Sequence, residues 1–264
     1  MPHWLEAIIL GLVEGITEFI PVSSTAHLLI SEKILGLKES DLFNIVIQSG
    51  AVLAIIPLFW RQFCGMTFGL ADPKNRDLLT KIVVAFGITS VGMLILEKRG
   101  LKLPEELKPV AWALLVGGVV IFLVEAISKR RMLEDAATWP VVIIAFGLCQ
   151  IVAGVFPGAS RSGATIMAAM LLGMSRPAAT EFTFLLGVPT LLAAGGWKLL
   201  KAVKAGDMHG AEWLHISIGF AAAAISSFVV VKWLIRYVQS HTFNSFAVYR
   251  VVAGAALLLW LIRG

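Results

Sequence analysis

Two carboxylates in the first apolar segment of the chain are spaced to share one face of a helix. Glu14 and Glu18 lie four residues apart, which stacks their side chains on successive turns. In a medium of low dielectric constant they repel each other, so one takes up a proton or a cation lies between them. Mg²⁺ is commonly held by one or two carboxylates together with substrate phosphate, and Ca²⁺ also prefers oxygen ligands. The pair predicts a divalent-cation site, Mg²⁺ or Ca²⁺; the alternative is a solvated face of an interfacial helix.

A hydroxyl and an imidazole follow these carboxylates. Ser24 and His27 lie three residues apart just after Pro21, and this spacing places them on one face of a helix. An imidazole within reach of a hydroxyl can take its proton, as in an activated nucleophile. We therefore expect Ser24, or a water, to attack with His27 as the proton acceptor. The alternative is structural, because Ser23, Ser24 and Thr25 are also ordinary helix N-cap residues.

An arginine marks a second polar turn, in the other half of the chain. Arg161 stands at a glycine-rich helix start between two serines. Free backbone N–H groups and the positive end of the helix dipole favour phosphate there, and a guanidinium can grip two phosphate oxygens at once. We therefore predict an anion-binding site at this helix start. The predicted phosphate-binding set is Ser23, Thr25, Gly158, Ser160, Arg161, Ser162, Gly163 and Thr165.

The two polar turns repeat one pattern, in which an apolar run enters a Pro-x-x-Ser turn. They align without a gap, with Pro21 on Pro157, Glu14 on Gln150, Ser24 on Ser160 and Thr25 on Arg161. Proline with adjacent serine and glycine interrupts a helix, and non-helical backbone at membrane depth is tolerated only where protein buries it or it lines water. We interpret residues 4–37 and 139–173 as re-entrant helical hairpins.

The rest of the chain has the composition of a membrane protein. Of its 264 residues, 58% are hydrophobic and 15% are charged, against about 45–50% and 25% in soluble domains. A spanning helix needs about 20 mostly apolar residues. Six stretches qualify: 42–60, 78–96, 109–127, 179–200, 213–235 and 244–262. The net charge of +5 is dispersed among the loops, which favours lipid headgroups as its counter-charge and argues against nucleic acid.

The repeat also predicts the architecture. Each half, 1–127 and 139–264, holds one hairpin and three spans, and residues 128–138 form the linker. An odd number of crossings per half gives the halves opposite orientations. We therefore predict an all-α polytopic membrane protein with an inverted-topology repeat, whose site lies near the midplane where broken helices meet. Lys and Arg divide about evenly between the two faces, so the positive-inside rule assigns no orientation.

Other polar side chains in the spans give weaker signals. Glu125, Glu181 and Arg250 are interpreted as structural ion-pair partners or as side chains that snorkel to the interface. The two cysteines, Cys64 and Cys149, have no ligand-like spacing and indicate neither a disulfide framework nor a zinc site.

The two hairpin sequences resemble the bacterial undecaprenyl pyrophosphate phosphatase family, the integral-membrane type associated with bacitracin resistance. Its signatures, Glu/Gln-Gly-x-Thr-Glu-Phe-x-Pro-x-Ser-Ser-Thr-x-His and Pro-Gly-x-Ser-Arg-Ser-Gly-x-Thr, match Glu14 to His27 and Pro157 to Thr165. The likeness runs through nearly the whole chain. It implies metal-dependent hydrolysis of the terminal phosphate of undecaprenyl pyrophosphate. The functional set that it implies is Glu14, Glu18, Ser24, His27 and Arg161.

The resemblance further implies a place in the bacterial inner (plasma) membrane, a site facing the extracytoplasmic side, and a homodimer. The product would be the monophosphate carrier used for peptidoglycan and related polymers. The alternative class is a secondary transporter or flippase for a phosphate-bearing anion or lipid, since inverted repeats with broken helices are typical of carriers and function belongs to the site. A non-catalytic membrane scaffold is the third hypothesis.

Overall fold

The computed structural model describes residues 2–100, 106–128, 134–205 and 210–263. Within these ranges the chain is helical and contains no strand, which confirms the predicted all-α class. Residues 129–133 of the predicted linker lie outside the described residues. The helices are α1 (His3–Thr17), α2 (Ser24–Leu35), α3 (Asp41–Leu53), α4 (Ile55–Leu58), α5 (Trp60–Phe68), α6 (Pro73–Lys98), α7 (Leu107–Ser128), α8 (Trp139–Val141), η1 (Val142–Leu148), α9 (Cys149–Val155), α10 (Arg161–Leu171), α11 (Arg176–Ala205), α12 (Gly210–Ser240) and α13 (Asn244–Arg263).

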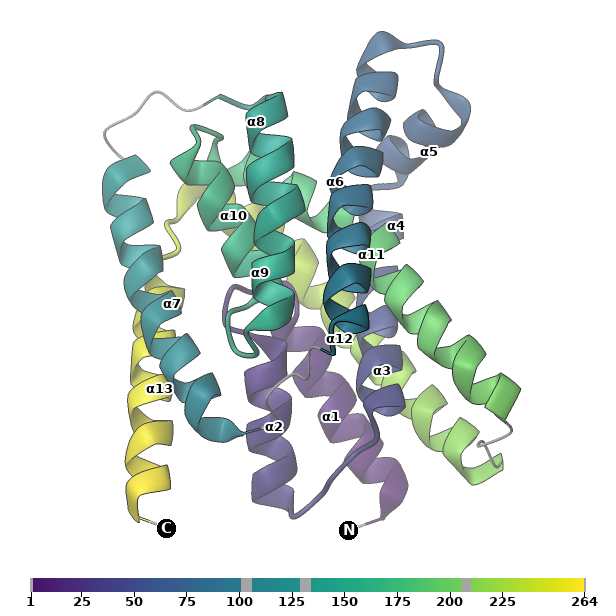
Figure 1. Ribbon diagram of the computed structural model, residues 1–264, viewed down its shortest axis with the longest axis vertical. Coiled ribbons are helices and arrows are strands. Elements are labelled where there is room, and N and C mark those ends of the chain that lie inside the picture. Colours follow the sequence, from purple (N-terminus) through teal and green to yellow (C-terminus); the bar gives the residue numbers. More distant parts are fainter. Residues whose placement is uncertain (1, 101–105, 129–133, 206–209, 264) are drawn as a thin grey trace.

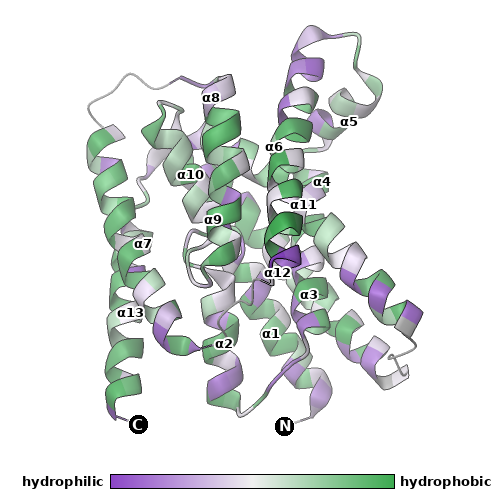
Figure 2. Ribbon diagram, in the orientation of Figure 1, coloured by the Kyte–Doolittle hydropathy of each residue, from purple (hydrophilic) through white to green (hydrophobic). Residues whose placement is uncertain are grey.

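Six helical segments in the described part of the chain are long and apolar enough to cross a membrane. They are Asp41–Leu58, Pro73–Lys98, Leu107–Ser128, Arg176–Lys204, Glu212–Ser240 and Asn244–Arg263. Each coincides with one of the six predicted stretches, which confirms a multi-pass membrane protein. Large apolar side chains such as Val91, Leu123 and Val229 are exposed on these helices, and Figure 2 shows the hydrophobic colouring along α6, α7 and α13. In a bilayer, hydrocarbon covers such surfaces.

Both predicted helix breaks are present. The first turn, residues 18–23, separates α1 from α2, and the second turn, residues 156–160, separates α9 from α10. The two helices of each pair pack against each other. In Figure 1, α1 and α2 lie in the lower half and α8 to α10 in the upper half, so that the two turns approach each other near the centre. The opposite orientation of the two halves stays a prediction.

Each turn ends in a serine with an unusual backbone conformation. Ser23 caps α2 with φ 75°, and Ser160 caps α10 with φ 69°. These are the two residues other than glycine with positive φ in the described chain. The Ser23 hydroxyl accepts a hydrogen bond from the Ala26 N–H at 3.4 Å, and the Ser160 hydroxyl accepts one from the Gly163 N–H at 3.1 Å. Each cap satisfies an N–H that has no acceptor within the helix.

The segment from the proline to the cap is one residue longer in the second turn than in the first, which corrects the gapless alignment. The cap follows Pro21 by two residues and Pro157 by three. The extra residue is accommodated at Gly158, whose φ of 93° is readily available only to glycine. Ser24 therefore corresponds to Arg161, and each is the first residue of its helix.

Small residues bring α1 close to α12. A Cβ added at Gly11 would lie 2.9 Å from the Ala222 Cβ, and one added at Gly15 would collide with the Ala223 carbonyl. Glycines four residues apart are a common means of close helix packing in membranes. This packing fixes the axis of α1, whose last turn carries Glu14 and whose C-cap is Glu18.

Candidate active site

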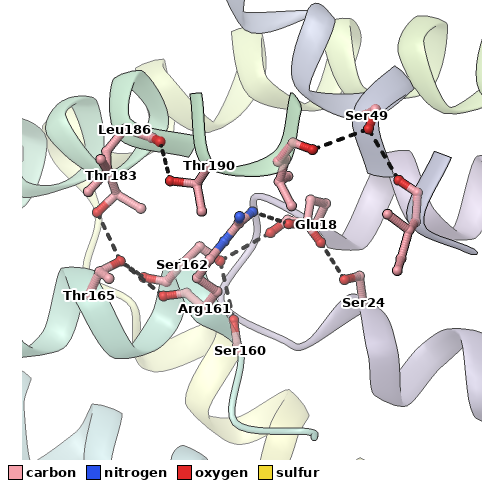
Figure 3. Close-up of polar contacts among 12 residues, drawn as sticks. Glu18, Ser24, Ser49, Ser160, Arg161, Ser162, Thr165, Thr183, Leu186 and Thr190 are labelled. Atoms are coloured by element: carbon pink, nitrogen blue, oxygen red, sulfur yellow. Dashed lines mark hydrogen bonds and ion pairs between the residues drawn. The ribbon is translucent and has the colours of Figure 1, made fainter. Parts of the chain in front are cut away.

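The carboxylate of Glu18 joins the two broken helices. Glu18 is buried at the end of α1. The Ser24 hydroxyl donates to its Oε2 at 2.5 Å, and the Arg161 guanidinium donates to its Oε1 from the second hairpin. The Ser162 hydroxyl donates to the Glu18 backbone carbonyl at 3.1 Å. Figure 3 shows these side chains converging from both turns, so residues about 140 positions apart in the sequence form one polar centre.

The hydrogen bonds of His27 go to residues other than Ser24, contrary to the sequence-based expectation. Its Nδ1 lies 2.7 Å from the Ser23 carbonyl, and its Nε2 lies 2.6 Å from the Tyr249 hydroxyl of α13. The His27 and Tyr249 rings are stacked with centroids 5.6 Å apart. A carbonyl only accepts, so Nδ1 carries the proton and, in the neutral imidazole, Nε2 accepts from the tyrosine. A shared helical face did not bring the two side chains together, because Ser24 turns toward α1 and His27 turns toward α13. A catalytic role for His27 stays a prediction.

Glu14 is fully buried one turn before Glu18, and neither of its carboxylate oxygens has a hydrogen-bond partner. Its charged neighbours are Glu18 and Arg161. A buried carboxylate without a partner is unfavourable by several kcal/mol unless a proton or a cation neutralises it. This orphaned group fits the predicted cation site.

The protein itself offers few ligands to such a cation. In the ranges that the structure describes, no group of three or more His, Cys, Asp or Glu side chains could hold a metal ion. Glu14 and Glu18 are the two neighbouring carboxylates at this position. Two carboxylates are enough for Mg²⁺ when water and substrate phosphate complete its coordination.

Small polar residues and glycine surround the start of α10. Besides capping Gly163, the Ser160 hydroxyl lies 3.2 Å from that of Ser162. Gly163 itself is tightly placed, because an added Cβ would lie 3.3 Å from the Pro21 Cβ of the first turn. The start of α10 thus packs closely against the first turn.

Two residues of the predicted phosphate-binding set lie apart from this centre. Thr165 is buried, but its hydroxyl donates to the Arg161 carbonyl at 2.9 Å and lies 3.1 Å from that of Thr183 on α11. Thr25 is exposed. Thr165 therefore fastens α10 to α11, and Thr25 stands outside the hydrogen-bonded network. Each faces away because its position on the helix, rather than its residue type, sets its direction.

The charged residues of the spans divide into two groups. Glu125 forms the predicted ion pair, with Arg176 Nε 2.9 Å from its Oε1, and Glu181 accepts from Gln62 Nε2 at 3.0 Å. Arg250 behaves differently, because each hydrogen bond that the structure gives it ends on a backbone carbonyl. Sequence reasoning missed the parts played by Arg250 and by Tyr249. For Arg250 the available signal was its charge inside an apolar span.

The fold and the site define a polytopic membrane protein in which two broken helices bring a carboxylate, a hydroxyl and a guanidinium together inside the helix bundle. The chain belongs to the family described as bacitracin resistance protein BacA, whose sequence model matches residues 7–256.

Named relatives cover nearly the whole chain. An undecaprenyl-diphosphatase of Xanthomonas oryzae pv. oryzae (strain PXO99A) is 51% identical over 262 residues, which are 99% of this chain and 98% of the relative. One of Xanthomonas campestris pv. campestris (strain 8004) is 50% identical, with 99% of each chain covered. One of Rhizobium etli is 48% identical over 256 residues, 97% of this chain and 96% of the relative.

Proposed function

We propose that this chain is a membrane phosphatase that hydrolyses undecaprenyl pyrophosphate to undecaprenyl phosphate and inorganic phosphate. The reaction returns the lipid carrier to cell-wall polymer synthesis. The family and the named relatives support this activity. The single structural observation that carries it is the carboxylate of Glu18, which receives a hydroxyl from one hairpin and a guanidinium from the other.

Phosphoryl transfer requires the reacting groups to be placed and the negative charge of the phosphoryl oxygens to be neutralised. In the proposal, the phosphate of the substrate replaces Glu18 as the partner of the Arg161 guanidinium, whose planar fork matches two oxygens. The carboxylate of Glu18 is then free to accept the proton of Ser24, or of a water that Ser24 positions, as this nucleophile attacks the terminal phosphorus. The P–O bond to the bridging oxygen breaks, and undecaprenyl phosphate leaves. If Ser24 is the nucleophile, water then hydrolyses the phosphoserine to inorganic phosphate and the free serine. His27 offers Nε2 as a second proton acceptor once its bond to Tyr249 opens.

The proposal includes a divalent cation, Mg²⁺ or Ca²⁺, held by Glu14 and Glu18. When bound, it supplies positive charge beside the pyrophosphate oxygens. Support comes from the two unpartnered oxygens of Glu14. The polyprenyl tail and the surrounding membrane lipids lie against the apolar outer faces of the helices, and nucleic acid has no part in the function.

We further propose that the protein works in the bacterial inner membrane, as a homodimer, with its site open to the extracytoplasmic side. These three points rest on the resemblance of the hairpin sequences to the phosphatase family. Orientation is tested by labelling single cysteines placed in opposite loops of intact cells with an impermeant reagent.

The test of the activity is phosphate release from undecaprenyl pyrophosphate by the purified protein in detergent with Mg²⁺. We expect Glu18→Gln and Arg161→Ala each to lower kcat by a factor of about 10² or more, the range for loss of a proton acceptor or a charge-stabilising donor. Glu181→Gln is the matched control, since Glu181 bonds Gln62 away from the turns. Near wild-type turnover of both site variants would refute the assignment.

The purified protein reconstituted in proteoliposomes distinguishes the rival classes. Phosphate release and tracer flux of a labelled polyprenyl phosphate are measured side by side. Hydrolysis without flux supports the phosphatase, whereas flux without hydrolysis identifies a carrier. If the protein is a non-catalytic scaffold, neither phosphate release nor tracer flux is observed, and the residues of the site can be replaced without consequence.

A further inference from the structure

Arg250 is a buried cation at the junction of the two turns. It lies on α13, is 1% exposed, and is the largest of the fully buried side chains. Its Nη1 donates to the Pro21 carbonyl of the first turn at 3.1 Å. Its Nη2 lies 3.0 Å from the Gly158 carbonyl and 3.3 Å from the Ala159 carbonyl of the second turn. One guanidinium thus bonds both turns.

The same side chain is fastened to α7. Arg250 Nη2 also lies 2.9 Å from the Ala113 carbonyl, and Nε lies 3.4 Å from the Leu114 carbonyl. A charged group at such depth is unfavourable unless polar partners surround it. Here the carbonyl oxygens supply them, and the carbonyls of the non-helical turns gain donors in return.

The packing of α7 against α13 leaves room for this group. A Cβ added at Gly117 of α7 would lie 2.5 Å from the Arg250 Cζ and 2.8 Å from its Nε. A Cβ added at Gly254 would lie 2.9 Å from the Ala111 carbonyl. Small residues on both helices therefore create the space that the guanidinium fills.

The bonded carbonyls lie next to the groups proposed for catalysis. Pro21 precedes Ser24 by three residues, and Ala159 precedes Arg161 by two. We propose that Arg250 is a positioning residue, which sets the separation of the two turns and so holds Ser24 and Arg161 in register on one phosphate. It touches neither substrate nor reacting atoms. Its effect on turnover rests on the proposed function, while its hold on the turns does not.

The experiment begins with Arg250→Ala, compared with wild type and with Arg176→Ala. Arg176 is a second arginine between helices, but its partner is Glu125, outside the turns. We expect Arg250→Ala to lower kcat by about 10²-fold, the effect of a misplacement of about 1 Å, with KM changed by less than about threefold. Added guanidinium should enter the carbonyl-lined space and raise kcat of this variant by about tenfold or more, whereas ammonium of equal ionic strength should not.

Hydrogen exchange gives a reading that is independent of activity. We expect faster exchange in peptides covering residues 18–24 and 156–161 of Arg250→Ala, reversed by guanidinium, and no change there in Arg176→Ala. Should the wild type fail to hydrolyse the substrate while this difference in exchange is present, the proposed function fails and the positioning role stands.

A second variant covers the case in which Arg250→Ala does not fold. Gly117→Ala leaves Arg250 intact but displaces its guanidinium, and Gly87→Ala is the control because a Cβ there meets nothing within 4 Å. We expect lower kcat and faster exchange of both turns in Gly117→Ala only. Wild-type kcat and unchanged exchange of the turns, in folded Arg250→Ala or in Gly117→Ala, would overturn the proposal.

Discussion

Ser24 and Arg161 are the first residues of α2 and α10, and both donate a hydrogen bond to the carboxylate of Glu18. The two helix starts are therefore equivalent in position and different in chemistry. One brings a hydroxyl that can attack, and the other brings a cation that can hold an anion. Glu18 occupies the place between them, where the proposed reaction requires a phosphoryl group.

The equivalence makes Ser24 the first residue to test as a nucleophile. In Ser24→Ala we expect kcat to fall by a factor of about 10² or more, because the variant lacks the hydroxyl that Glu18 is proposed to activate. Radiolabelled phosphate from the terminal position of the substrate should be trapped on the wild-type protein after rapid acid quenching, and not on Ser24→Ala. Undiminished turnover by Ser24→Ala would exclude the serine and leave water as the nucleophile.

Glu14 should limit stability and favour cation binding at the same time. In Glu14→Gln, measured without divalent cation, we expect the thermal midpoint to rise by a few degrees, since about 1 kcal/mol corresponds to roughly 2–4 °C in a chain of this size. The neutral amide loses less on burial than an unpartnered carboxylate does. The same variant should need more Mg²⁺ for half-maximal turnover, with Glu6→Gln as the control on the same helix. Identical Mg²⁺ dependence in Glu14→Gln and wild type would remove Glu14 from the cation site.

Tyr249 should act through the orientation of His27. Tyr249→Phe removes the hydroxyl that lies 2.6 Å from His27 Nε2, and a neutral hydrogen bond is worth about 1 kcal/mol, or a factor of about five in rate. We expect Tyr249→Phe to lower kcat by about fivefold. The chain has one other tyrosine, Tyr237, whose hydroxyl bonds the Thr242 carbonyl, so Tyr237→Phe is the matched control. Equal kcat values in the two variants would show that the His27–Tyr249 bond has no bearing on turnover.

Gly158, the glycine of the second turn, should be sensitive to substitution. Its φ is 93°, and an added Cβ would lie 3.0 Å from both the Ala113 Cβ and the Val110 carbonyl. Gly158→Ala therefore combines backbone strain of about 1–2 kcal/mol with overpacking of about 1–3 kcal/mol. Gly173 also has positive φ, 100°, but nothing within 4 Å, so Gly173→Ala isolates the strain. We expect lower thermal stability in both and lower kcat in Gly158→Ala only; similar kcat in the two would mean that the crowding is relieved without moving Arg161.

Much of the architecture could be predicted from the sequence because it depends on local properties. Runs of about 20 apolar residues locate spanning helices wherever they occur, and Pro21 and Pro157, each followed by serine within three residues, mark the two helix breaks. Ser23 was among the three candidate N-cap residues for the same reason, since its hydroxyl bonds an N–H group only three residues away; Ser160, predicted as a phosphate-binding residue, has the same cap geometry. The composition and the two polar turns thus determined the class of protein and the segments that form the site.

Only the tertiary structure decided which of these side chains meet. Ser24 and His27 share a face of α2, yet packing of α1 on one side and α13 on the other gives them different partners. One extra residue at Gly158 changes which position of α10 matches Ser24. The placement of Arg250 depends on three distant segments, α7 and the two turns, whose carbonyls surround it. Contacts of this kind are set by the distances between helices, and a pattern of residue types along the chain carries no record of those distances.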